Sequence, residues 1–399
     1  MNDNEKLGAL YPEGFLAASI NCGIKAEKKD LTLLVCPKGA AIAATFTQNL
    51  CCAAPVILDK EHLRSGKFRA IITNSGNANA ATGDKGLADA RATAVALAKE
   101  LNCAVEEVYV CSTGCIGKFL PVEKIISGIP EIVKCLENSA KADSDAAEGI
   151  LTTDLVKKQV RRDVKLSGGT VKIGGMCKGS GMIAPNMATM LAYLTTDAKI
   201  EQALLQEMFS KAVKASFNHV SVDGDTSTND SAFLFASGES GISLESREDI
   251  AAFENALTDA CIELAKDIAR DGEGATKFVE VTVEGAKTVK DAEIIAKTIA
   301  NSPLVKTSIC GGDPNWGRIL AAAGRAGVPY DQYSVDLYMG NLPAALGGMN
   351  SGTPREKLAE VYRQKEVFVR LVLKEGNASF TAWTCDMTHG YIDINVDYT

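Results

Sequence analysis

The chain has 399 residues, of which 46% are hydrophobic and 23% are charged, and this composition is typical of a globular protein with one large or two medium domains. The formal net charge of -8 disfavours nucleic acid or an acidic membrane surface as the main partner. No apolar run approaches the length of a membrane span, and the start, MNDNEKLGAL, lacks the pattern of a signal or transit peptide. We therefore expect a cytoplasmic protein.

Cysteine and histidine limit the kinds of chemistry available to the chain. The closest cysteine spacings among the twelve cysteines, Cys51–Cys52 and Cys111–Cys115, match no paired zinc-binding pattern. We expect no metal or other cofactor, and mostly buried free thiols in a reducing compartment, although the role of the cysteines stays open. Because there are three histidines, a Ser-His-Asp triad is disfavoured and a catalytic base must come from another group.

The first part of the chain is predicted to alternate strands with a helix. Apolar or alternating runs bounded by turn residues predict strands within 11–25 and over 31–37, 40–46, 68–73 and 107–111. Apolar residues at three- and four-residue spacing predict a helix over 87–101. A hairpin is predicted over 160–166 and 170–174.

Two polar segments follow strands in this region. The segment NSGNANAATG, 74–83, is equally typical of a structural and of a functional loop. In STGCIG, 112–117, Thr113 and Gly114 offer a hydroxyl and a backbone N–H side by side, the two donors that an oxyanion hole needs. A phosphate-binding loop is the alternative, but Phe119 replaces the residue that would hold magnesium.

A turn-rich run, KGSGMIAPNMATM, occupies 178–190. Gly179 and Gly181 permit unusual backbone angles, Pro185 fixes its own φ, and an apolar run beginning at Met190 predicts a buried strand. Thr189 therefore stands where a tight turn enters a strand. An ordinary turn is the simplest interpretation; the alternative is an exposed hydroxyl beside a strained peptide bond.

The second half continues the alternation. Helices are predicted over 200–217, 250–268, 291–300 and about 355–363, a helix start over 311–319, and strands over 278–283, 333–338, 367–373 and 391–396. The run VDGDTSTND, 222–230, lacks the glutamate that a calcium loop requires at its twelfth position. Glu273 lies between two glycines and is typical of a solvated turn, although flanking glycines also permit close approach to a ligand. The fold class predicted is α/β, with layered sheets covered by helices.

From about residue 12 to its end, the chain resembles the ornithine acetyltransferase family, also called bifunctional glutamate N-acetyltransferase. The longest similar run is KGSGMIAPNMATML, 178–191, and 74–83, 112–117, 152–154, 222–230, 270–277 and 311–319 are also similar. The resemblance implies self-cleavage between Ala188 and Thr189. Residues 1–188 would then form an alpha chain and 189–399 a beta chain with an N-terminal nucleophile, two copies of each assembling into a heterotetramer.

The same resemblance implies a ping-pong transfer of acetyl from N2-acetylornithine to L-glutamate in arginine biosynthesis. Thr189 would carry the acetyl group, and its free α-amine, with a pKa of about 8, would be the base. Thr113 and Gly114 would hold the oxyanion. Whether acetyl-CoA also donates, making the enzyme bifunctional, stays open.

Substrate-binding positions follow from the resemblance alone. They are Thr152 or Thr153, Lys178, Thr189, Glu273, Asn395 and Thr399. The segment GILTTDLVK, 149–157, is by itself typical of a helix cap, so the choice between its two threonines is open. The family has one more residue between the final Asn and its end, so Thr399 matches imperfectly.

Two other functions use part of this residue set. An N-terminal-nucleophile amidohydrolase would use Thr189 and the oxyanion donors but pass the acyl group to water. A non-enzymatic amino-acid-binding protein would keep Lys178 and Glu273 without cleavage.

Overall fold

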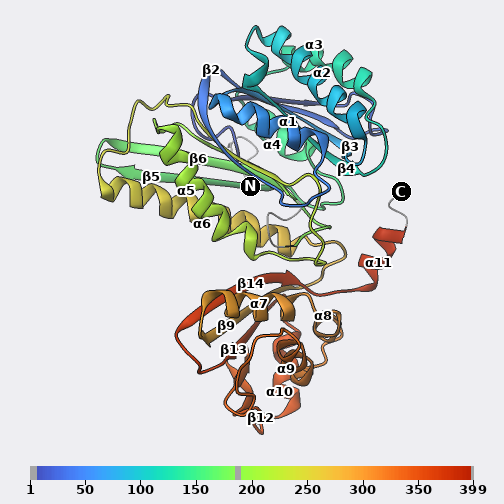
Figure 1. Cartoon of the computed structure of the whole chain (residues 1–399), viewed down its shortest axis with the longest axis vertical. Coiled ribbons are helices and arrows are strands. Elements are labelled where there is room, and N and C mark those ends of the chain that lie inside the picture. Colours follow the sequence, from blue (N-terminus) through green and yellow to red (C-terminus); the bar gives the residue numbers. More distant parts are fainter. Residues whose placement is uncertain (1–6, 185–189, 397–399) are drawn as a thin grey trace. The chain divides into compact units, whose positions relative to one another are not determined.

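The computed structural model describes residues 7–184 and 190–396, which divide into two compact units (Figure 1). The first unit contains the described parts of Met1–Gly179, Asn186–Asn218 and Thr226–Ala265. The second contains those of Ser180–Pro185, His219–Asp225 and Lys266–Thr399. Each unit is built on its own sheet, so the predicted α/β class is confirmed.

The described part of the first unit contains an eight-stranded sheet with the order β4-β3-β2-β8-β7-β6-β5, and β1 pairs with β2. The pairs β3–β4 and β7–β8 are parallel, and the other pairs are antiparallel. The strands are β1 (Leu16–Ile20), β2 (Leu31–Phe46), β3 (Lys67–Asn77), β4 (Val108–Cys115), β5 (Lys158–Leu166), β6 (Gly169–Lys178), β7 (Leu191–Thr196) and β8 (Ser231–Ala236).

Helices cover this sheet and enclose its cores. They are α1 (Ala54–His62), α2 (Gly83–Leu101), α3 (Val122–Lys134), α4 (Ala140–Gly149), α5 (Gln202–Lys214) and α6 (Arg247–Arg270), the last of which continues into the second unit. One core packs β1–β4 against α2 and α3. A second core packs aromatic side chains of β4, β7 and β8 with α4, and includes Tyr109, Tyr193 and Phe233. Because residues of β4, β6 and β7 are packed in this core, the core holds these three strands in position.

The described part of the second unit contains a six-stranded sheet, with the order β12-β11-β10-β13-β9-β14. Its core joins valines of β9 to isoleucines of α7, including Val281, Ile295 and Ile299. The strands are β9 (Phe278–Ala286), β10 (Asp336–Met339), β11 (Leu342–Leu346), β12 (Met349–Asn350), β13 (Glu366–Val372) and β14 (Ala378–Cys385). The helices are α7 (Val289–Ala300), α8 (Pro303–Cys310), α9 (Trp316–Gly324), α10 (Arg355–Tyr362) and α11 (His389–Val396).

The predicted strands differ from the structure in two places. The strands predicted over 31–37 and 40–46 form one long strand, β2, with an irregularity in its pairing between Val35 and Ala40. The strand predicted over 391–396 is wrong, because these residues belong to the helix α11. The Thr388 hydroxyl accepts the Gly390 amide at 3.0 Å where this helix begins. None of the residues of α11 is buried, so the alternation of apolar residues in 391–396 does not arise from a strand with one face in the core.

Two further properties concern the helices and the cysteines. None of the helices in the described residues combines the length and apolar character that a membrane crossing requires. All twelve cysteines are free thiols, but the expectation that most are buried is wrong, because only five are: Cys36, Cys111, Cys177, Cys261 and Cys385.

Candidate active site

The oxyanion donors predicted from sequence lie at the end of two parallel strands in the first unit. Thr113 of β4 pairs with Ser75 of β3, and Gly114 pairs with Gly76. Gly114 has φ +133°, and a Cβ atom there would lie 2.3 Å from the backbone carbon of Gly76. This close approach requires glycine, because no other residue tolerates both the backbone angle and the contact.

Asparagines of the NSGN segment hold this strand end in place. The Ser112 hydroxyl donates to Asn74 Oδ1 at 2.6 Å, and Asn74 Nδ2 donates to the carbonyl of Asn77 at 2.8 Å. Asn77 Nδ2 donates to the carbonyls of Lys118 and Phe119, each at 3.2 Å. The segment predicted as a loop from 74 therefore belongs to β3 as far as Asn77, and these contacts give it a structural role beside Thr113.

Lys178 ends β6 and contacts the first oxyanion donor. It is 3% exposed, and its Nζ donates to Thr113 Oγ1 at 3.3 Å. The same Nζ lies 3.9 Å from Asp154 Oδ2. The structure thus brings together Lys178, Thr113 and Gly114, three residues that the sequence analysis assigned to the site.

Asp154 forms the centre of a buried polar cluster. Its Oδ1 accepts from Lys158 Nζ at 2.9 Å and from the Gly179 amide at 2.7 Å, and its Oδ2 accepts from the Thr152 amide at 3.1 Å. Burial alone would raise the pKa of Asp154, but Lys178, Lys158 and the Gly179 amide together hold that pKa below its usual value.

The helix-cap interpretation of 152–154 is wrong. The helix α4 ends at Gly149 and no helix begins before β5, so the Thr152–Asp154 turn organises the lysines instead. The sequence analysis missed this role of Asp154, because Thr-Thr-Asp is also a common capping pattern.

A third lysine adds positive charge to this region. Lys25 Nζ donates to the Ser75 hydroxyl at 2.6 Å and to the carbonyl of Leu151 at 2.7 Å. Burial lowers the pKa of Lys25 to about 8, and the charge of Lys178 contributes to the lowering. Lys158 and Lys178 lie within 4 Å of the Asp154 carboxylate, and Lys25 adds a third positive charge in this region, which favours the binding of an anion.

Asn229 and Asp230 directly precede β8, and they are functional candidates that sequence reasoning missed. Asn229 Nδ2 donates to the carbonyl of Ser112 at 2.9 Å, and Asp230 Oδ1 accepts the Met190 amide at 2.9 Å. Asp230 Oδ2 is buried and has no hydrogen-bond partner among the described residues. Burial raises the pKa of Asp230 well above its ordinary value. The sequence analysis noted that 222–230 is similar to the family, but it assigned no role to either residue.

The second unit brings two other predicted residues together. Asn395 Nδ2 of α11 donates to Glu273 Oε2 at 2.8 Å, across 122 residues of chain. Glu273 is 8% exposed, and its amide donates to the Ser180 carbonyl at 2.9 Å. A Cβ atom at Gly181 would lie 2.2 Å from the Glu273 carboxyl group, so a larger residue there would displace this carboxyl group. The Glu273 carboxylate is therefore buried and oriented by a hydrogen bond from Asn395, so Glu273 is not a solvated turn residue.

Three predicted residues lie outside the described part of the chain. They are Ala188, Thr189 and Thr399. Among the described residues, Met190 is the nearest in sequence to the expected nucleophile.

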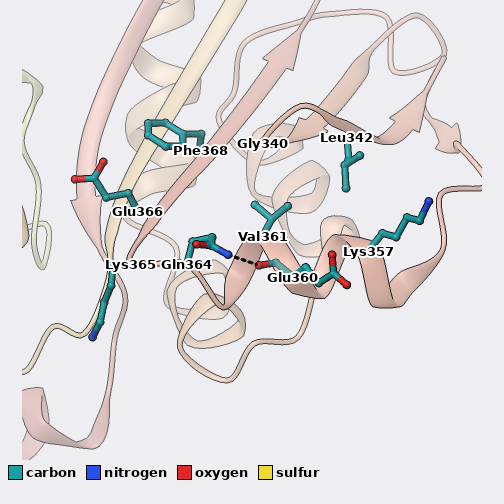
Figure 2. Close-up of a pocket in the computed structure, with 9 residues that line it drawn as sticks. All are labelled: Gly340, Leu342, Lys357, Glu360, Val361, Gln364, Lys365, Glu366 and Phe368. Carbon is teal, nitrogen blue, oxygen red and sulfur yellow. Dashed lines mark hydrogen bonds between the residues drawn. The ribbon is translucent and has the colours of Figure 1, made fainter.

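A separate cavity in the second unit contains none of the predicted site residues. Figure 2 shows this cavity of about 590 Å³, to which α10 contributes Lys357 and Glu360 and β13 contributes Glu366 and Phe368. Its charged lining residues are of both signs, so it does not share the positive character of the Asp154 cluster.

Comparison with known proteins decides the family. The family model described as "ArgJ family" matches residues 16–399. The chain belongs to the ArgJ family. The resemblance drawn from the motifs is thereby confirmed, and it extends over almost the whole sequence.

Individual family members match at high identity. The arginine biosynthesis bifunctional protein ArgJ of Chlorobaculum tepidum is 51% identical over 391 residues, covering 98% of this chain and 96% of that protein. The protein of the same name from Dehalococcoides mccartyi is 45% identical, covering 97% and 96%. A crystal structure of the Bacillus halodurans ArgJ protein is 41% identical with a TM-score of 0.50, and covers 52% of this chain but 98% of the solved chain.

Proposed function

We propose that this protein is a glutamate N-acetyltransferase that transfers the acetyl group of N2-acetylornithine to L-glutamate in arginine biosynthesis. The proposal is supported by membership of the ArgJ family and by relatives named as arginine biosynthesis bifunctional proteins. The observation that carries it is the arrangement of Thr113, Gly114 and Lys178, because this places two oxyanion donors beside a buried cation.

The transfer proceeds in two halves through an acetyl ester on Thr189. In the first, the Thr189 hydroxyl attacks the acetyl carbonyl while the α-amine of the same residue accepts the hydroxyl proton. Thr113 and Gly114 donate hydrogen bonds to the oxyanion, the amide C–N bond breaks, and ornithine leaves with that proton. In the second half, the amine of glutamate attacks the ester, and the Thr189 hydroxyl is regenerated.

Activation requires cleavage of the Ala188–Thr189 bond, since an N-terminal threonine supplies both nucleophile and base. Fragments 1–188 and 189–399 remain associated, with two of each in the assembly. The Bacillus halodurans structure supports this division, because a solved chain covering about half of this one is what a divided protein gives.

Substrate recognition depends on charge. Lys178, with donor hydrogens that no described residue accepts, binds a carboxylate of the substrate, and Glu273 binds an ammonium group. Asn395, Thr399 and one of Thr152 and Thr153 complete the contacts. No cofactor takes part in the proposed transfer.

The test is acetyl transfer by the purified protein. Ornithine release from N2-acetylornithine should require L-glutamate and equal the N-acetylglutamate formed. Equal ornithine release without glutamate, with free acetate as the product, would identify an amidohydrolase instead. A separate reaction with acetyl-CoA as sole donor and glutamate as acceptor determines whether the enzyme has the second activity.

A further inference from the structure

The contacts of Lys178 assign a role to the carboxylate beside it. We propose that Asp154 is a positioning residue, which holds the Lys178 ammonium group on the Thr113 hydroxyl so that this hydroxyl presents its hydrogen to the oxyanion. The inference rests on the proposed function, because the oxyanion concerned is that of acetyl transfer.

Asp154 is suited to this role because it cannot reorient. Its side chain is completely buried, and both carboxylate oxygens accept hydrogen bonds from groups fixed by the chain. The Gly179 amide at 2.7 Å is especially informative, since Gly179 directly follows Lys178. Asp154 therefore holds the backbone directly after Lys178. It also attracts the Lys178 ammonium group, whose Nζ lies 3.9 Å from Asp154 Oδ2.

The direction of the Lys178–Thr113 hydrogen bond follows from chemistry. An ammonium group has donors and no acceptor, so at 3.3 Å the Thr113 oxygen must accept from Lys178. The hydroxyl hydrogen of Thr113 is then free to point elsewhere, and a hydroxyl that accepts from a cation is a stronger donor. Lys178 would thus orient and polarise the oxyanion donor as well as bind substrate.

Lys158 shares the same carboxylate and gives the proposal an internal control. Its side chain is completely buried, and its Nζ lies 2.9 Å from Asp154 Oδ1. Removing Asp154 leaves two buried ammonium groups without their counter-charge, which favours loss of a proton from Lys178. Removing Lys158 leaves Asp154 to Lys178 alone, which favours retention of that proton. The two substitutions should therefore act in opposite directions.

The experiment measures kcat for acetyl transfer as a function of pH in Asp154→Asn and Lys158→Met. In Asp154→Asn, the pH at which activity is lost on the basic side should fall by about one unit or more, and kcat should fall at least roughly tenfold. In Lys158→Met, activity should persist to higher pH than in the native protein. The matched control is Asp163→Asn, at an exposed aspartate of β5. It should change neither kcat nor the pH at which activity is lost on the basic side.

Other titratable groups face Lys178 and must be separated from it. Besides Asp154 and Lys158, these are Lys25, whose pKa is about 8, and the buried Asp230. The basic limb is therefore measured again in a Lys25→Met background, where the shift produced by Asp154→Asn should persist. If Asp154→Asn no longer shifts the basic limb in the Lys25→Met background, the loss of activity at high pH belongs to Lys25, and the proposal is overturned.

A double-mutant cycle tests whether Asp154 acts through Thr113. Asp154→Asn should lower kcat much less in a Thr113→Ala background, because the hydroxyl that it positions is already absent. Equal losses in both backgrounds, or shifts of the basic limb in the same direction for Asp154→Asn and Lys158→Met, would refute the positioning role. If Asp154→Asn does not fold, the upward shift in Lys158→Met decides alone. Failure of the native protein to transfer acetyl would instead refute the proposed function.

Discussion

Asp230 accepts the amide hydrogen of Met190 at 2.9 Å, so a buried carboxyl group fixes the residue that follows the expected nucleophile. The preceding residue, Asn229, donates to the carbonyl of Ser112, which directly precedes the oxyanion donor Thr113. The side chains of Asn229 and Asp230 thus contact Ser112 and Met190, which are the sequence neighbours of Thr113 and of the expected nucleophile. Because both are at most 7% exposed, these contacts lie in the packed interior of the first unit.

Asp230 should make stability depend on pH. Burial raises its pKa in the folded protein, so the folded state keeps a proton that the unfolded state loses above about pH 4. The contribution of Asp230 to stability is therefore complete below the unfolded pKa and falls as pH rises, by up to about 1.4 kcal/mol per pH unit. Asp230→Asn, which does not titrate, should gain stability relative to the native side chain between pH 5 and pH 8.

This comparison is made by urea unfolding in an uncut Thr189→Ala background, so that a single chain unfolds. Asp163→Asn removes an exposed carboxyl group and serves as the control, for which no comparable gain is expected. Parallel stability curves for Asp230→Asn and its parent would contradict the prediction.

Maturation should depend on Thr189. The purified protein should run as two fragments on a denaturing gel, and N-terminal sequencing of the second should give Thr-Met-Leu-Ala. Thr189→Ala should remain a single chain, because no hydroxyl is left to attack the carbonyl of Ala188. A cut Thr189→Ala protein would indicate an external protease and exclude self-cleavage.

The Thr113 hydroxyl should contribute to the rate. Thr113→Ala should lower kcat roughly a hundredfold, because one donor to the oxyanion is lost, while KM changes little. Thr113→Ser keeps a hydroxyl and should retain most of the activity. If Ser and Ala variants lose activity equally, or if Thr113→Ala turns over normally, Thr113 has a structural role only.

Local sequence predicted one side of the site because strand and turn chemistry are local. The β4 strand and its Thr113-Gly114 end could be predicted from an apolar run followed by Thr-Gly. The contact between Lys178 and Thr113 could not, since 65 residues separate them in the chain and β3, β2, β8 and β7 lie between β4 and β6 in the sheet. The assignment of Lys178 therefore came from family resemblance.

The same reasoning explains the errors. Thr152–Asp154 carries a capping pattern, but its carboxylate binds two lysines that are distant from any helix start. In α11, alternating isoleucines suggested a strand, although an exposed helix places no constraint on such a pattern. In the first case Lys178, on the other strand of the β5–β6 hairpin, is a partner that the local pattern does not reveal, and in the second no buried contact constrains the pattern.

The chain end should be required for transfer, although termini ordinarily tolerate change. Asn395 Nδ2 donates to Glu273 Oε2 at 2.8 Å, which links α11 to a carboxylate expected to bind substrate. Asn395→Ala should raise KM roughly tenfold or more through loss of an oriented contact, and deletion of Asp397, Tyr398 and Thr399 should cripple transfer. Self-cleavage should survive both changes, since its chemistry requires Thr189 and its local turn. Asp393→Ala, at an exposed position of the same helix, is the control and should transfer acetyl normally. Normal turnover by the truncated protein would remove Thr399 from the site, and normal KM in Asn395→Ala would remove Asn395.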